Sequence, residues 1–374
     1  MSLRVLELFG GIGACTQALK RLGIDIEVVD YVEIDKYAVA SYNAINGTDF
    51  ESQDICEWDK NIEADLIMHG SPCQDFSVAG KGAGGDLGSG TRSSLMYETI
   101  RIVGKTRPKH VIWENVKNLL SKKHKHNFDA YIETMNVLGY NSYYQVLDAK
   151  DYGIPQHRER VYTISIRKDI DKGDFKFPEK EELKLRLKDM LEDEVDEKYY
   201  LSGEQVKRIK LSTYNVSKTR IQEKDYCDTL CARDWKDPKC VRIGGIFDTE
   251  NSKHQAGSIY DKEGLSPTLD IMQGGWRQPS IIEKKSAYER NFGSKGKLQN
   301  LEKECDTLQA AMGNGGGNIP IVEENIKIRK LTPKECWRLM GFDDESFLRA
   351  KNVPMSNTQL YKQARKLNRC RCFI

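Results

Sequence analysis

The chain has no long hydrophobic run and no export signal. None of its apolar stretches approaches the ~20 residues that a membrane helix needs. The N-terminus passes straight into the strand-like run Leu3–Phe9, without the basic start and longer apolar stretch of a signal peptide. We therefore expect a globular protein of the cytoplasm with no membrane partner.

A strong excess of charge of one sign is also missing. The formal net charge is +2, so any nucleic-acid contact has to be local. One basic stretch contains Arg101, Lys105, Arg107, Lys109, Lys117, Lys122, Lys123 and Lys125. Composition alone favours a solvated helix face for this stretch over a nucleic-acid contact.

Paired Cys-x-x-Cys motifs do not occur. Ten cysteines in a chain of this size, without an export signal, do not make a disulfide scaffold. Neither of the closest pairs, Cys227 with Cys231 and Cys370 with Cys372, belongs to the paired Cys-x-x-Cys arrangement of a zinc site. We expect free thiols and no metal.

What the first half does contain is an alternation of strand and helix patterns. Strand patterns occupy Leu3–Phe9, Glu27–Val32, Ala64–His69, His110–Glu114, Tyr143–Asp148 and Arg160–Ile166. Helical spacing occupies Cys15–Leu22, Lys36–Asn43, Leu95–Val103 and Phe128–Leu138. This alternation predicts an α/β domain with a parallel sheet covered on both faces. Ligands bind to such sheets beyond the carboxyl ends of the strands.

The pattern changes after about residue 166. A charged stretch is followed by a region rich in Gly, Thr and Pro, in which a Thr-Leu core recurs at Thr229, Thr268 and Thr307, with a spacing of 39 residues. A fixed period of this size is typical of one supersecondary unit used several times. We expect a sheet domain over residues 1–180, joined again by 351–374, and a smaller β- and loop-rich domain over 181–350.

A glycine turn follows the first strand. Phe9, Gly11 and Gly13 belong to Phe-Gly-Gly-Ile-Gly, which lets a ligand approach the backbone closely. The third glycine of the dinucleotide fingerprint is replaced by Thr16. Glu33 ends the second strand and can accept hydrogen bonds from two ribose hydroxyls. Together these features favour a nucleoside ligand without a pyrophosphate, such as S-adenosyl-methionine; the alternative is an ordinary turn with a solvated Glu33.

A cysteine stands directly after the third strand, in Gly-Ser-Pro-Cys-Gln at Cys73. A thiolate beyond a strand end is a strong nucleophile in the place where this fold carries its chemistry. The alternative is a small buried thiol. Six glycines between Gly80 and Gly90 form a stretch suited to closing over a substrate, which favours the nucleophile.

Three further charged side chains are candidates for the same crevice. Glu114 ends the fourth strand and, if desolvated, can hold or supply a proton near neutral pH. Arg158 and Arg160 alternate along a later strand and therefore point to one face, where they can hold a substrate carbonyl. The alternative for the two arginines is a surface salt bridge with Glu159.

In their order along the chain, these motifs resemble the cytosine-5 DNA methyltransferase family of bacterial or phage modification type. The motifs are Phe-x-Gly-x-Gly, Pro-Cys-Gln, Glu-Asn-Val, Gln-x-Arg-x-Arg and the stretch Arg329–Phe342. The resemblance implies a large Rossmann-like domain that binds S-adenosyl-methionine and a smaller target-recognition domain carrying the three repeats. It also implies double-stranded DNA in the cleft between them.

The resemblance also implies a role for each candidate. Cys73 attacks carbon 6 of a flipped-out cytosine, Glu114 assists protonation of ring nitrogen 3, and Arg160, with Arg158, holds the base. The methyl group then passes to carbon 5. The implied cofactor contacts are Phe9, Gly11, Gly13, Glu33, Ile34, Asp54, Ile55 and Pro72. A monomer is implied, with a cognate restriction endonuclease as a further partner. A tRNA substrate is a competing reading, which the long recognition region disfavours.

The last motif of the family is Gln-x-Tyr-x-Gln-x-Gly-Asn-Ser-Ile-Val-Val. The chain follows it through Gln359–Ala364 and then reads as a basic tail, residues 365–374. Codons can be chosen for this tail so that removing one base restores Gly-Asn-Ser-Ile-Val-Val, which indicates a frameshifted or truncated last motif. A DNA-binding remnant with little methyl transfer is therefore the alternative to an active enzyme.

Overall fold

The protein is seen here in a computed structural model. The structure describes residues 2–72, 76, 84–86, 88–200, 242–245, 258–260, 262, 266, 279–289 and 321–366. Cys73, Thr229, Thr268, Thr307 and the tail from residue 367 lie outside these described residues. The predictions made for them are carried forward as predictions.

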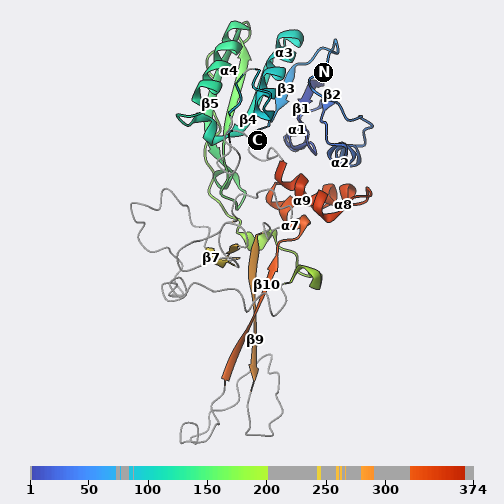
Figure 1. The fold of residues 1–374 in the computed structure, drawn as a ribbon, viewed down its shortest axis with the longest axis vertical. Helices are drawn as coiled ribbons and strands as arrows, with labels where there is room; N and C mark the ends of the chain where they lie inside the picture. The colour runs from blue at the N-terminus through green and yellow to red at the C-terminus, as the bar shows by residue number, and fades with distance from the viewer. Residues whose placement is uncertain are drawn as a thin grey trace, which may run out of the picture.

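A six-stranded sheet forms the centre of the N-terminal half (Figure 1). Its strands are β1 (Leu3–Leu8), β2 (Ile26–Val32), β3 (Leu66–His69), β4 (His110–Val116), β5 (Tyr140–Asp148) and β6 (Glu159–Arg167), in the order β2-β1-β3-β4-β6-β5. All six strands were predicted from the sequence, with ends that differ by a few residues.

The prediction of a wholly parallel sheet is wrong. Strands β1 to β4 are parallel, but β6 runs antiparallel to both β4 and β5. The short connection between β5 and β6 contains no crossover helix, and a parallel pairing would require one. The reversed strand places Arg160 opposite Val116 and Tyr162 opposite Glu114.

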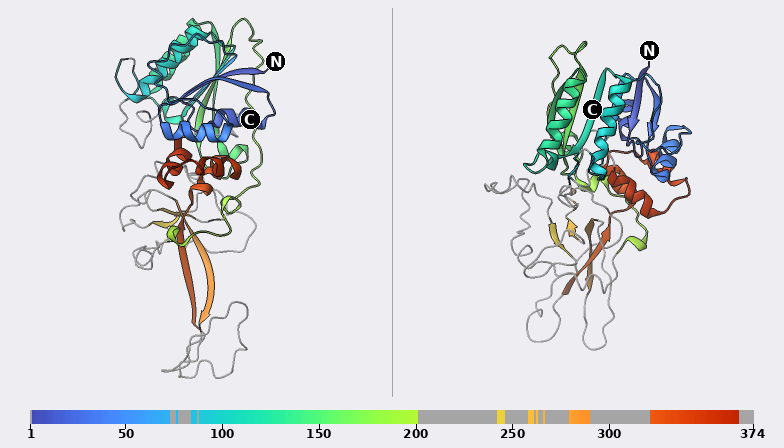
Figure 2. Two further views of the ribbon diagram at one scale, coloured as in Figure 1. Left: turned by 90° about the vertical axis from the view of Figure 1, so that its right-hand side faces the viewer. Right: turned by 45° about the horizontal axis from the view of Figure 1, so that its top comes forward.

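Helices cover both faces of this sheet (Figure 2). They are α1 (Ala14–Arg21), α2 (Lys36–Asn46), α3 (Met96–Thr106) and α4 (Lys125–Val137). Successive residues of β1 point to opposite faces: Leu6 and Leu8 pack in the core with α3 and α4, and Val5 packs with α1. Each such buried side chain contributes roughly 2 kcal/mol to stability.

The C-terminal helices pack against α1 and α2. They are α7 (Pro333–Leu339), α8 (Asp344–Lys351) and α9 (Asn357–Lys366). One core cluster joins Ala18 and Ile45 to Trp337 and Leu360, and the Trp337 indole N–H donates to the Leu360 carbonyl at 3.0 Å. Part of the stretch assigned to the smaller domain thus packs on the sheet domain, while the predicted domain boundaries stay a prediction.

A second sheet contains the remaining strands, β7 (Arg242–Gly245), β8 (Ser258–Tyr260), β9 (Ser280–Glu289) and β10 (Ile321–Lys330), in the order β10-β9-β8-β7. The antiparallel pair β9 and β10 extends away from the first sheet (Figure 1). Short 3-10 turns occur at Arg92–Leu95, Lys117–Leu120, Ala149–Tyr152, Leu187–Met190 and Glu197–Tyr199.

Candidate active site

The glycine turn after β1 has a backbone that only glycine adopts easily. Gly11 and Gly13 have φ angles of 56° and 87°, and the Gly13 N–H donates to the Gly10 carbonyl at 2.9 Å. A Cβ on Gly13 would lie 2.7 Å from the ring of Tyr42, so a side chain fits neither the backbone nor the space. Phe9 also has a positive φ of 52°, which is uncommon for a residue with a side chain. The turn is therefore tightly specified at the carboxyl end of β1.

Glu33 lies against this turn at the end of the neighbouring strand. Its carboxylate accepts hydrogen bonds from the Gly11 N–H at 3.2 Å and from the Asp35 N–H at 2.8 Å. The Tyr31 hydroxyl donates to the Gly11 carbonyl. Ile34 follows with 67% of its surface exposed, which is unusual for an isoleucine. A carboxylate and an apolar side chain thus stand together at the rim of the glycine turn.

The segment with Asp54 and Ile55 lies beside Glu33. The Gln53 N–H donates to the Glu33 carbonyl at 3.0 Å, which fixes the segment to the end of β2. Asp54 is exposed and accepts from the Cys56 N–H at 2.9 Å, whereas Ile55 is buried. The structure therefore brings the predicted residues Gly11, Glu33 and Asp54 to one edge of the sheet.

Ser71 and Pro72 leave β3 at the same edge. Ser71 is buried, and its hydroxyl accepts from the Trp113 indole N–H at 3.0 Å. The Asn115 side-chain amide donates to the Ser71 carbonyl at 3.4 Å. The chain leading into Cys73 is thus anchored to β4 by the residues on either side of Glu114. The contacts of Trp113 and Asn115 with Ser71 were not predicted from the sequence, although both residues stand in the Trp-Glu-Asn-Val motif.

Glu114 is buried between two arginines. Its carboxylate lies 3.1 Å from the Arg160 Nε and 4.0 Å from the Arg158 Nη2. Burial raises the pKa of Glu114, and the two guanidiniums partly oppose that rise. Glu159 instead pairs with Lys117 at 2.7 Å, so the alternative of a surface salt bridge to the arginines does not hold. The arrangement therefore holds a carboxyl group that is protonated more easily than an exposed glutamate, next to fixed positive charge.

Helix α9 approaches the same edge from the far end of the chain. Lys362 pairs with Asp35 at 2.8 Å, and the Gln363 amide donates to the Tyr37 carbonyl at 2.9 Å. Asp35, two residues after Glu33, caps the N-terminus of α2. These contacts join segments that are more than 300 residues apart, and no local pattern could have identified them.

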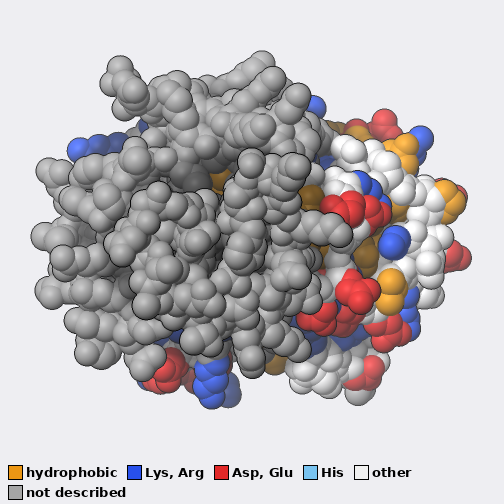
Figure 3. Space-filling view, turned by 90° about the horizontal axis from the view of Figure 1, so that it is seen from below, with side chains coloured by type: hydrophobic (Ala, Val, Ile, Leu, Met, Phe, Trp, Pro, Cys, Tyr) orange, Lys and Arg blue, Asp and Glu red, His pale blue; other side chains and the backbone are white. Residues whose placement is uncertain are grey.

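The basic stretch that begins at Arg101 is largely neutralised. Five of its eight basic side chains form ion pairs with carboxylates, namely Arg101, Lys105, Lys109, Lys117 and Lys125. On the described part of the face seen from below, acidic and basic side chains are interspersed (Figure 3). The five ion pairs agree with the solvated-face interpretation of the stretch.

Among the described residues, no three His, Cys, Asp or Glu side chains gather as a metal ion would require. None of the helices given above combines the length and the apolar character that crossing a bilayer demands.

Comparisons with known proteins show what the chain is similar to. The profile of the family described as C-5 cytosine-specific DNA methylase matches residues 3–364. The orphan methyltransferase M.SPBetaI of Bacillus phage SPbeta is 33% identical over 441 residues, covering 97% of this chain and 94% of that protein. The type II methyltransferase M.HhaI of Haemophilus parahaemolyticus is 32% identical over 362 residues, covering 96% and 89%.

Solved structures show the same fold at lower identity. The Entamoeba histolytica methyltransferase EhMeth has a TM-score of 0.62 at 15% identity, over 100% of this chain and 95% of its own. The S. pombe Dnmt2 methyltransferase has a TM-score of 0.60 at 17% identity, over 100% and 96%. The predicted Rossmann-like α/β fold is therefore confirmed.

Proposed function

Because the chain belongs to the C-5 cytosine-specific DNA methylase family, we propose that it transfers a methyl group from S-adenosyl-methionine to carbon 5 of a cytosine flipped out of double-stranded DNA. The observation that supports this most is the buried Glu114 carboxyl, held by Arg158 and Arg160 beside the strand that leads into Cys73. The family match continues to residue 364, and the relatives are named methyltransferases, so the reading as a DNA-binding remnant is not favoured.

The residues around the glycine turn fit the proposed methyl donor. S-adenosyl-methionine supplies a methyl group on a positively charged sulfonium. Glu33 and Asp54 are carboxylates that can accept from ribose hydroxyls and from an adenine amino group, whereas they would repel a pyrophosphate. Ile34 and Ile55 are apolar side chains at the same edge that can pack on a flat ring. Phe9 and Pro72 stand at the ends of β1 and β3, where the contacts would be completed.

Cys73 and Glu114 have different roles in the proposed reaction. The Cys73 thiolate forms a bond to carbon 6 of cytosine, and the electron pair of the 5,6 double bond moves towards carbon 5. Glu114 holds a proton at ring nitrogen 3, which its burial keeps available. Carbon 5 then takes the methyl group as its bond to the sulfonium sulfur breaks, and a neutral thioether is left. A base removes the proton from carbon 5, the bond to sulfur breaks, and the double bond and the thiolate return.

Arg158 and Arg160 have two tasks in this proposal. They hold Glu114 in place, and their fixed positive charge can bind the carbonyl oxygen of the base.

Residues 181–350 read the target sequence, and the protein acts as a monomer in the cytoplasm. A restriction endonuclease of the same specificity would be its functional partner.

The test is the transfer of labelled methyl groups to DNA of mixed sequence. Glu114→Gln should lower turnover by about 100-fold or more, the size of a general acid–base contribution. Cys73→Ser should lower it at least as far, because it removes the nucleophilic thiolate. Glu159→Gln is the matched control, because Glu159 is the neighbouring carboxylate that pairs with Lys117, and it should stay within about twofold of wild type.

A covalent bond gives an independent readout. DNA that contains 5-fluorocytosine should remain attached to the wild-type protein, because fluorine at carbon 5 cannot leave as a proton does. Cys73→Ser should release that DNA. A Cys73→Ser protein that keeps a tenth of wild-type turnover, or that still traps the DNA, would contradict the proposed nucleophile.

A further inference from the structure

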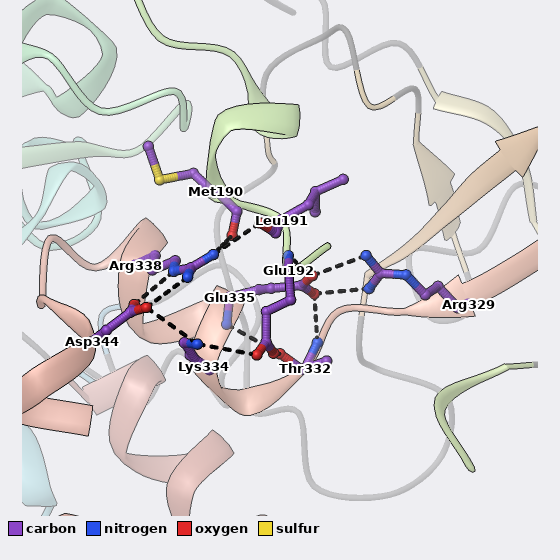
Figure 4. A network of polar contacts seen from close by, with 9 residues as sticks. All are labelled: Met190, Leu191, Glu192, Arg329, Thr332, Lys334, Glu335, Arg338 and Asp344. Atoms are coloured by element: carbon purple, nitrogen blue, oxygen red, sulfur yellow. Dashed lines mark hydrogen bonds and ion pairs between the residues drawn. The ribbon is translucent and has the colours of Figure 1, made fainter. Parts of the chain in front are cut away.

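Two stretches of chain connect the first sheet domain with the second sheet. Residues 187–200 run from the first domain towards the second sheet. The chain returns from the end of β10 through Thr332 into α7. The two stretches meet in a backbone bridge between Tyr200 and Arg329. A network of polar side chains holds them together at this crossing (Figure 4).

Glu335 stands at the centre of this network. Its carboxylate accepts two parallel hydrogen bonds from the Arg329 guanidinium, both at 2.9 Å, and neither side chain is exposed to solvent. It also accepts from the Glu192 N–H at 2.8 Å and from the Thr332 N–H at 2.8 Å. These four donors belong to the outgoing stretch, the end of β10 and the start of α7, so one carboxylate binds all three.

Helix α7 provides a fixed base for these contacts. Trp337 and Leu339 are buried in the core that includes α1 and α2. Arg338 binds Asp344 through two contacts at 2.7 Å, and it donates to the Leu191 carbonyl at 2.8 Å. The helix therefore cannot move with respect to the first domain without breaking several contacts. Strand β10, in contrast, extends away from its base at Lys330 (Figure 1).

A buried ion pair of this kind adds little net stability compared with apolar residues of the same size. The bidentate geometry instead fixes the relative orientation of the two side chains, because a planar guanidinium fits a carboxylate in one orientation only. Arg329 lies in β10 and Glu335 in α7, so the pair fixes the angle at which β10 leaves the first domain.

We propose that Glu335 is a positioning residue that sets the angle between the catalytic domain and the β9–β10 sheet and thereby determines how strictly the enzyme selects its DNA sequence. The inference rests on the proposed function, in which the region containing this sheet reads DNA. Loss of the pair lets the recognition region sample other angles, so cytosines outside the preferred sequence reach the catalytic residues. Cofactor binding should be unaffected, because the Glu335 carboxylate binds Arg329, Thr332 and the backbone of Glu192, none of which is among the predicted cofactor contacts.

The experiment compares variants by methylating mixed genomic DNA and mapping the modified cytosines by bisulfite sequencing. The main variant is Arg329→Met with Glu335→Gln, which removes both charges and leaves an amide oxygen that can accept from the backbone N–H groups of Thr332 and Glu192, so the fold should be retained. The control is Arg349→Met with Glu345→Gln, the same pair of changes at an exposed ion pair on α8. Thermal melting and S-adenosyl-methionine titration check the fold and the cofactor site of each protein.

The ratio of methylation at preferred sites to methylation elsewhere should fall at least tenfold in the main variant and stay within twofold in the control. A second variant, Arg329→Lys, keeps the charge but loses the bidentate contact. Its ratio of methylation at preferred sites to methylation elsewhere should lie between those of the main variant and the control. A folded main variant, or a folded Arg329→Lys protein, with the wild-type ratio overturns the inference. Absence of methyl transfer by the wild-type protein would instead refute the proposed function.

Discussion

The buried Glu7 carboxyl group provides a test of how burial changes the pKa of an ionisable side chain in this fold. It lies in β1 just before the glycine turn, with no exposed surface. The Thr16 hydroxyl donates to its carboxylate at 2.5 Å, and the Tyr42 hydroxyl lies 3.0 Å from that of Thr16. Burial raises the pKa of Glu7 from its ordinary value of 4.5 to about 7, although the hydrogen bonds from Thr16 and Cys15 act in the opposite direction.

The sign of the effect on stability follows from this shift. The folded state holds the proton more tightly than the unfolded state, so the stabilising contribution is fully present below pH 4.5 and is lost as the pH rises to about 7. A shift from 4.5 to about 7 corresponds to roughly 3 kcal/mol of unfolding free energy. Glu7→Gln removes the titration and keeps an oxygen that can accept from Thr16.

The assay is urea unfolding of both proteins at several pH values from 5 to 8, followed by tryptophan fluorescence. The stability of Glu7→Gln relative to wild type should rise by roughly 3 kcal/mol between pH 5 and pH 8, because only the wild type has to bury a charge. Glu133→Gln makes the same chemical change at an exposed position of α4 and should show no such trend. A difference between Glu7→Gln and wild type that is constant over this pH range would refute the reasoning.

Two further predictions concern the cofactor edge. Gly47→Ala should cost about 1 kcal/mol of unfolding free energy because the glycine has a positive φ, and Gly13→Ala should cost more because its Cβ would also lie 2.7 Å from the Tyr42 ring. Only Gly13→Ala should also weaken S-adenosyl-methionine binding, by at least tenfold in calorimetric titration, because its new Cβ would strike Tyr42, whereas that of Gly47 meets nothing within 4 Å. Replacing residues 365–374 by Gly-Asn-Ser-Ile-Val-Val and a following apolar helix should tighten cofactor binding and raise the melting temperature, since the basic tail cannot be buried without desolvating its charges. Equal affinities and equal melting temperatures of the two versions would show that the tail does not limit function.

The sequence by itself determined the elements of the first domain and most of the candidate site. Local periodicity identified all six strands of the sheet and helices α1 to α4, because each pattern depends only on neighbouring residues. The rule that ligands bind beyond the carboxyl ends of parallel strands then predicted that Gly11 and Glu33 would share one edge, and the family resemblance added Asp54 to them. Ordered motifs were sufficient to identify the family.

Only the tertiary structure decided which distant segments pair. The antiparallel direction of β6 brings Arg160 to within 3.1 Å of Glu114, and the return of α9 to the first domain joins Lys362 to Asp35. Glu335 forms a local capping box with Thr332 at the start of α7, yet it also binds Arg329 and the backbone of Glu192. Such contacts depend on burial and on charges that find partners across the whole chain, and a periodic pattern of neighbouring residues carries no information about either.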